Sequence, residues 1–242
     1  MSAGPTHKAT VTRAHLRTPR AAAIAGIVFS VLLITALVLL RLSVPLDPLE
    51  PGAWVRTNSD RVTFALTLVP FAGIAFLWFI GVLRDRLGDL EDRFFSTVFL
   101  GSGLLFLAML FVAAAVAGST ILAYGGQGDA LPQSVAYTLA RALSYSIMNI
   151  YAVKIAGVFM ITTSTIAIRT GIAARWIAYL GYALAVFLLF GGGFTDWTFL
   201  VFPLWVLLMS SYILIDNLRR GPSAASVNPA PEGSGAVATE SR

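Results

Sequence analysis

Six long apolar segments, separated by short polar stretches, are the feature that most constrains how this chain can fold. They lie at about 21–42, 62–83, 95–117, 143–168, 176–190 and 197–215. About 20 apolar residues in a helix cross the hydrocarbon core of a bilayer, and a helix satisfies its backbone hydrogen bonds internally. The sequence therefore predicts an all-α fold, a polytopic transmembrane helical bundle of six spans over residues 21–220.

The segments outside these spans are polar. Residues 1–20 are basic, with no acidic residue, and residues 221–242 are rich in Ala, Ser, Gly and Pro. Neither segment has the apolar content that a packed core requires, so both are predicted to be disordered, as a cytoplasmic arm and a cytoplasmic tail. Residues 43–61 contain three prolines, which break helices, and are predicted to form an outer loop.

The distribution of positive charge predicts the orientation in the membrane. The chain is 57% hydrophobic and 12% charged, with a net charge of +5. Most basic residues fall in segments 1–20, 84–93, 169–175 and 219–242, whereas the predicted outer loops hold only Arg41, Arg56 and Arg61. Because Arg and Lys concentrate on the cytoplasmic side, both termini are expected in the cytoplasm. The basic residues follow topology and form no surface patch, so the expected partner is the lipid bilayer and not nucleic acid.

Several residue types needed for chemistry are missing from the spans. There is no Cys, and the two histidines, His7 and His15, lie in the amino-terminal arm. No Asp or Glu falls in the middle of a span. Haem ligation, a His-based metal site, an intramembrane protease and a carboxylate proton relay are therefore not expected. The sequence predicts no cofactor and a non-enzymatic protein, with Ser102 serving as a small residue at a helix contact.

Lys154 is the one ionisable residue well inside a predicted span. If the fourth span ends at Ile168, Lys154 lies roughly 8 Å below the outer surface, and its stem can nearly cover that depth by snorkelling. The alternatives are a site for an anion or a lipid headgroup, or an ion pair with Asp60, Asp129 or Asp196.

The fourth span contains the other candidate binding residues. Asn149 and Tyr151 lie near its outer end, and the polar run Thr162-Thr163-Ser164-Thr165 lies lower down. A substrate path along this helix would use Lys154, Asn149 and Tyr151. Four consecutive hydroxyls cannot share one face, however, and each can bond back to its own helix, so packing is the favoured interpretation of that run.

The connector 84–93 holds the acidic residues closest together in sequence. Asp85, Asp89 and Asp92 would share a face if the connector were helical, and three such carboxylates suit Mg²⁺ held against a lipid phosphate. Arg84, Arg86 and Arg93 offset most of that charge, so a solvated, salt-paired connector is the favoured interpretation.

Small residues recur along the first span. Ala22, Gly26 and Ser30 are spaced by four and so share one helix face, which allows close approach of another helix in lipid. Such faces predict contacts within the bundle, with a second copy of the chain, or with other membrane subunits.

Two motifs carry a family resemblance. Arg84-Asp85-Arg86-Leu87-Gly88, continuing to Glu91-Asp92-Arg93-Phe94-Phe95, precedes Gly101-Ser102-Gly103-Leu104-Leu105. This region resembles uncharacterised multi-pass membrane proteins of actinobacteria. The resemblance implies bacterial origin and a place in the cytoplasmic (inner) membrane, and it implies no particular activity.

Three functions remain open from the sequence. The first is a non-enzymatic bundle or subunit of a membrane complex, which the small-residue faces and the few buried polar groups favour. The second is a small transporter or channel that uses the fourth helix. The third is a lipid-modifying enzyme that uses the charged connector 84–93.

Overall fold

A computed structural model describes residues 18–45, 54–87, 93–127, 134–191 and 197–219. The helices are α1 (Thr18–Ser43), α2 (Trp54–Leu87), α3 (Arg93–Gln127), α4 (Val135–Ser146), the π-helix η3 (Ile147–Ala152), α5 (Val153–Thr170), α6 (Arg175–Phe190), the short 3₁₀-helix η4 (Thr198–Leu200) and α7 (Val201–Arg219). The described residues contain no strand, which confirms the all-α fold.

The described helices include five that are long and apolar enough to cross a bilayer: α1, α2, α3, the rod formed by α4, η3 and α5, and η4 with α7. The apolar helix α6 has 16 residues, and it is shorter than a full crossing requires. The chain is therefore a multi-pass membrane protein, and a crossing by α6 needs flanking residues to complete it.

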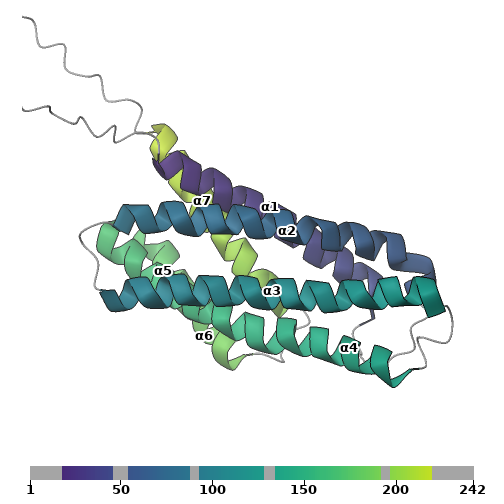
Figure 1. Cartoon of the computed structure of the whole chain (residues 1–242). Coiled ribbons are helices and arrows are strands. Elements are labelled where there is room, and N and C mark those ends of the chain that lie inside the picture. The colour runs from purple at the N-terminus through teal and green to yellow at the C-terminus, as the bar shows by residue number, and fades with distance from the viewer. Residues whose placement is uncertain (1–17, 46–53, 88–92, 128–133, 192–196, 220–242) are drawn as a thin grey trace, which may run out of the picture.

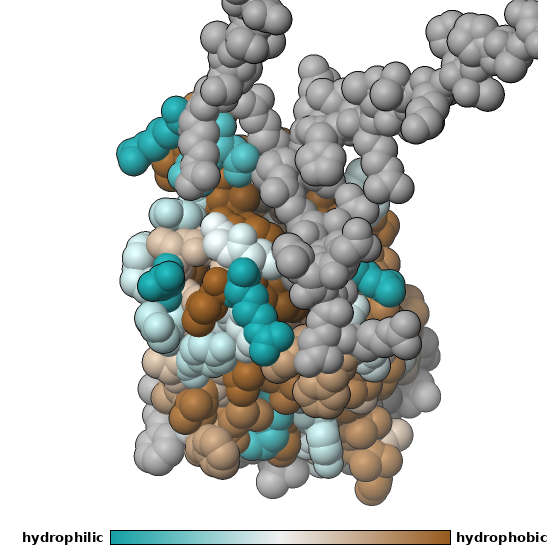
Figure 2. All heavy atoms as spheres, turned by 90° about the vertical axis from the view of Figure 1, so that its left-hand side faces the viewer, coloured by the Kyte–Doolittle hydropathy of each residue, from teal (hydrophilic) through white to brown (hydrophobic). Residues whose placement is uncertain are grey.

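The long helices α1 and α2 form one antiparallel pair, and α3 forms a second with the α4–α5 rod (Figure 1). α6 and α7 lie alongside one half of this arrangement (Figure 1). α1 packs along α2, α3 packs on α2 and on the α4–α5 rod, and α7 packs on α1. α6 lies against α5. α1 begins and α7 ends at the same end of the bundle, as an even number of crossings requires (Figure 1). Figure 2 looks onto that end, where hydrophilic side chains lie among the apolar helix ends.

The centre of the bundle is a cluster of phenylalanine rings drawn from five helices. Phe76 of α2 lies at its middle, with ring centroids 4.5 Å from Phe29, 5.3 Å from Phe159, 5.6 Å from Phe106 and 5.9 Å from Phe202. All five side chains are almost fully buried. In lipid the association of helices depends on such packing, because the bilayer is as apolar as the side chains.

The small-residue face of α1 makes the expected helix contact. Ala22, Gly26 and Ser30 are all buried. A Cβ added at Gly26 would lie 2.1 Å from Ser210 Oγ of α7 and 2.9 Å from a ring carbon of Phe79 of α2. Gly26 is therefore the point at which three helices approach most closely on this face.

The prediction of a continuous outer loop over residues 43–61 is wrong for its second half. α2 begins at Trp54, and α1 continues to Ser43. Asn58 Nδ2 donates to Ser43 O at 3.0 Å, and Trp54 Nε1 donates to Tyr137 OH at 2.9 Å. These tertiary contacts favour helix in a stretch whose polar composition alone indicates a loop.

Candidate ligand-binding cleft

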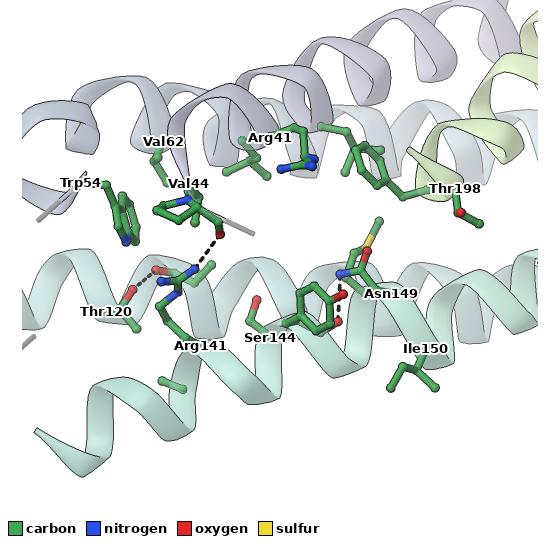
Figure 3. A pocket seen from close by; sticks show the side chains of 18 residues that line it. Arg41, Val44, Trp54, Val62, Thr120, Arg141, Ser144, Asn149, Ile150 and Thr198 are labelled. Carbon is green, nitrogen blue, oxygen red and sulfur yellow. Dashed lines mark hydrogen bonds between the residues drawn. The ribbon is translucent and has the colours of Figure 1, made fainter. Parts of the chain in front are cut away.

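A cavity of about 450 Å³ lies toward the end of the bundle away from the start of α1 and the end of α7 (Figure 1). Figure 3 shows its lining. Its walls are the outer part of α1, the start of α2, the end of α3 and the α4–η3 segment, and Thr198 and Phe199 of η4 close its inner side. α1 and α4 are not among the closely packed helix pairs of the described residues, and the cavity lies between them. We refer to this cavity as the outer cleft, where outer means only the end of the bundle away from Thr18 and Arg219.

Most of the outer cleft is apolar. Its apolar lining includes Leu37, Leu40, Val44, Val62, Met148 and Phe199. The cationic side chains of the described lining are Arg41 and Arg141, and no carboxylate occurs among the described lining residues. An apolar cavity with a few convergent polar groups is the usual form of a ligand site.

Arg141 is held in the cleft by Pro45, which follows α1, by Trp54 of α2, and by Tyr137 of its own helix. Its Nη2 donates to Pro45 O at 2.9 Å, and its guanidinium lies 5.6 Å from the ring centroid of Trp54 and 6.0 Å from that of Tyr137. The bond from Trp54 to Tyr137 ties the same rings together. Ser134 begins α4 by accepting the backbone N–H of Tyr137. This network fixes α4 against α1 and α2 and directs Arg141 into the cleft (Figure 3).

Arg41 enters the cleft from the opposite wall. It belongs to the last turn of α1, and its guanidinium lies 5.6 Å from the ring centroid of Trp197. In Figure 3 the α1 wall carrying Arg41 faces the helix that carries Arg141. Each guanidinium has five N–H donors, so an arginine can bond to the protein and to a ligand at the same time.

The π-helix η3 forms part of the cleft wall that faces α1. Met148, Asn149 and Ile150 are consecutive, and all three line the outer cleft. A π-helix has a wider turn than an α-helix, with i→i+5 bonding, and π-segments occur often at functional sites. Asn149 Nδ2 donates to Tyr145 O at 3.0 Å within the same wall. The wider turn therefore brings neighbouring residues onto one cavity.

The depth of the cleft in the bilayer follows from helix geometry. Arg169 lies in the last turn of α5, and Asn149 lies about 30 Å from it along the helix axis, which equals the thickness of the hydrocarbon core. Arg141 lies about 42 Å from Arg169 along the same rod, about 12 Å beyond Asn149. Arg41 lies about 30 Å from the start of the apolar part of α1 at Ala21. Measured from Ala21 and Arg169, the cleft therefore begins about one hydrocarbon thickness away, toward the far end of the bundle.

The structure brings one predicted binding residue into the cleft and leaves two outside. Asn149 lines it, whereas Tyr151 is exposed on the bundle surface and Lys154 is exposed next to α6. The substrate path expected from Lys154, Asn149 and Tyr151 is thus not a single site, because the three side chains point to different surroundings.

Lys154 caps a helix. Its Nζ donates to Leu189 O at 2.7 Å, in the last turn of α6. The last carbonyls of a helix lack partners within the helix and form the negative end of its dipole, so a cation is stabilising there. A backbone carbonyl was not among the partners for Lys154 that the sequence suggested. Asp129 and Asp196, two of the partners considered there, lie outside the described residues, and Asp60 is exposed on α2.

Replacing Lys154 by Met is therefore expected to destabilise the protein by about 1 kcal/mol, because it removes a charge-assisted bond at a helix end. Lys154→Arg, which keeps the charge, is the matched control and should melt close to the wild type. Melting temperature in mild detergent is the measurement. An unchanged or raised melting temperature for Lys154→Met would favour simple snorkelling instead.

The hydroxyls of the fourth span serve packing. Thr162, Thr163 and Thr165 donate to carbonyls three or four residues earlier in α5. Thr165 Oγ1 and Tyr182 OH, 2.7 Å apart, join α5 to α6. Ser164 is buried, and a Cβ added at Gly181 of α6 would lie only 2.2 Å from its Oγ, so the two helices are in close contact here. Ser102 likewise donates to Val98 O within α3.

The predicted metal site lies mostly outside the described residues. Asp89 and Asp92 fall in the undescribed segment 88–92, and the side chain of Asp85 is not described. Among the described residues, no group of three His, Cys, Asp or Glu side chains is close enough to hold a metal ion. The Mg²⁺ hypothesis for Asp85, Asp89 and Asp92 therefore stays a prediction.

The arginines of the cleft were not among the predicted site residues. Both lie in or beside apolar segments at the end where the sequence predicts the outer side, and the positive-inside rule predicts few basic residues there. That exception is the signal that points to them. Comparisons with protein-family models, with curated proteins and with solved structures found no match.

Proposed function

We propose that this chain is a non-enzymatic membrane protein that binds an anionic ligand in the outer cleft. The observation that carries the proposal is the placement of Arg41 and Arg141 on facing walls of one largely apolar cavity. Guanidinium groups match carboxylate and phosphate oxygens in geometry as well as in charge.

The fourth helix supplies much of the cleft, which favours ligand handling over a purely structural role. Arg141, Ser144, Met148 and Asn149 all come from the α4–η3 part of the rod. Below the cleft, buried phenylalanine rings fill the centre of the bundle. A filled core supports binding at one side of the membrane and does not favour a continuous channel.

The proposal places the protein in the cytoplasmic membrane of a bacterium, with both termini cytoplasmic. Arg84, Arg169, Arg175 and Arg219, all exposed, belong to the end of the bundle where α1 begins. The positive-inside rule assigns that end to the cytoplasm. The outer cleft then faces the periplasmic or external side. The motifs around 84–105 support the bacterial origin through their resemblance to actinobacterial membrane proteins.

Melting temperature in a neutral detergent, with and without inorganic phosphate or dodecyl phosphate, tests the proposal. We expect at least one of the two anions to raise the melting temperature of the wild type. Arg41→Gln combined with Arg141→Gln should abolish that increase, because no guanidinium remains in the cleft lining. Arg61→Gln is the matched control, since Arg61 is an exposed arginine of α2 that does not line the cleft. No response of the wild type to either anion would refute anion binding.

A further inference from the structure

The walls of the outer cleft carry two kinds of surface at two depths. Arg141, with the rings of Trp54 and Tyr137, lies toward the headgroup level. Leu37, Met148 and Phe199 line the part nearer the hydrocarbon. Resting on the proposed function, we infer that the ligand is an anionic glycerophospholipid of the outer leaflet. Its phosphate lies between Arg41 and Arg141, and the upper part of an acyl chain lies along the apolar wall.

The depth of the cleft favours a lipid over a soluble anion. Arg41 lies about one hydrocarbon thickness from Ala21, and Arg141 lies about 12 Å beyond that level along its own helix. A lipid phosphate just outside the hydrocarbon then lies between the levels of the two arginines. A lipid reaches this site by diffusing in the plane of the membrane, with its polar and apolar parts already at the right depths. A soluble anion gains nothing from the apolar wall that makes up most of the cavity.

The chemistry of the walls fits a lipid headgroup. Arginine binds phosphate through paired N–H donors, and its charge favours a lipid with net negative charge over a zwitterionic one, whose ammonium adds a repelled cation. Trp54, Tyr137 and Trp197 beside the two arginines are the residue types that rest at membrane interfaces, because each joins an apolar ring to a polar group.

The size of the cleft fits part of a lipid. Its volume of about 450 Å³ is within the range of about 300–1,000 Å³ that encloses a drug-sized ligand. That space holds a glycerophosphate headgroup and the first part of one chain, while the remainder of the lipid extends into the bilayer. α1 and α4 are not closely packed against each other, and the proposed lipid chains leave the cleft on this side.

The test uses the full chain in detergent with phosphatidylglycerol, with phosphatidylcholine of the same acyl chains, or with inorganic phosphate. Native mass spectrometry counts bound lipids, and melting temperature reports stabilisation. We expect phosphatidylglycerol to bind with at least about ten-fold preference over phosphatidylcholine, which corresponds to about 1.4 kcal/mol. Phosphate alone should have a much smaller effect.

Substitutions distinguish the contribution of the two arginines to lipid binding from that of the cavity volume. Arg41→Gln and Arg141→Gln should each reduce the preference for phosphatidylglycerol, whereas Arg61→Gln should leave it unchanged. Ala140→Phe, which fills the lining without altering charge, should reduce the binding of both lipids. Retention of the preference in the Arg41→Gln/Arg141→Gln double variant would overturn the assignment.

Two further outcomes distinguish failure of the lipid assignment from failure of anion binding. Equal stabilisation by inorganic phosphate and by phosphatidylglycerol, both lost in the double variant, would overturn the lipid assignment and leave the proposed function standing. No response to any anion would overturn both.

Discussion

Phe76→Ala is expected to lower the free energy of unfolding by about 3 kcal/mol, toward the lower end of the range for deleting a buried phenylalanine. Phe76 is fully buried, and its ring contacts rings from α1, α3, α5 and α7. Removing it leaves a cavity at the point where these helices meet. The lower end of the range applies because unfolded helices stay in an apolar solvent, so the loss is mainly one of packing.

The matched control for this change is Phe71→Ala. Phe71 lies on the same helix but is 61% exposed, on the lipid-facing side of α2. Its removal should change the melting temperature little, because a lipid chain replaces the contacts that are lost. Equal effects of the two substitutions on the melting temperature in detergent would show that the ring cluster does not hold the bundle together.

The fold class could be predicted from sequence because membrane helices are read from length and hydropathy alone. About 20 apolar residues between polar breaks are enough to place α1, α3 and α7, and the small-residue spacing of α1 was enough to predict its buried face. The start of α2 could not be predicted in this way. Residues 54–61 are polar, and the contacts of Trp54 and Asn58 with distant parts of the chain accompany their helical conformation.

The candidate site was largely invisible in the sequence for a related reason. Arg41 and Arg141 are separated by 100 positions, and only the antiparallel packing of the long helices brings their walls together. The π-turn that places Met148, Asn149 and Ile150 on one cavity has no local sequence signature. Lys154 stands out in the sequence because it is a charged residue inside a predicted span. In the structure its Nζ donates to one carbonyl, Leu189 O, at the end of α6.

Gly26→Val should destabilise the bundle by about 1–3 kcal/mol, the usual cost of inserting carbon atoms into a well-packed region. The Cβ of the new side chain would lie 2.1 Å from Ser210 Oγ and 2.9 Å from the Phe79 ring, and both neighbours are buried. α1 must then move away from α7 or from α2. Because Arg41 lies on the same helix, the α1 wall of the outer cleft should shift as well, with a reduced response to phosphatidylglycerol.

Gly101→Val separates this steric effect from the general effect of valine in a helix. Gly101 lies in α3, is exposed, and has no atom within 4 Å of an added Cβ. Both substitutions change helix propensity by the same small amount, so the difference between their melting temperatures isolates the clash at Gly26. Ser210→Gly in the Gly26→Val background removes the nearest clashing atom and should restore part of the stability. Similar melting temperatures for Gly26→Val and Gly101→Val would mean that α1 does not approach α7 as closely as the structure shows.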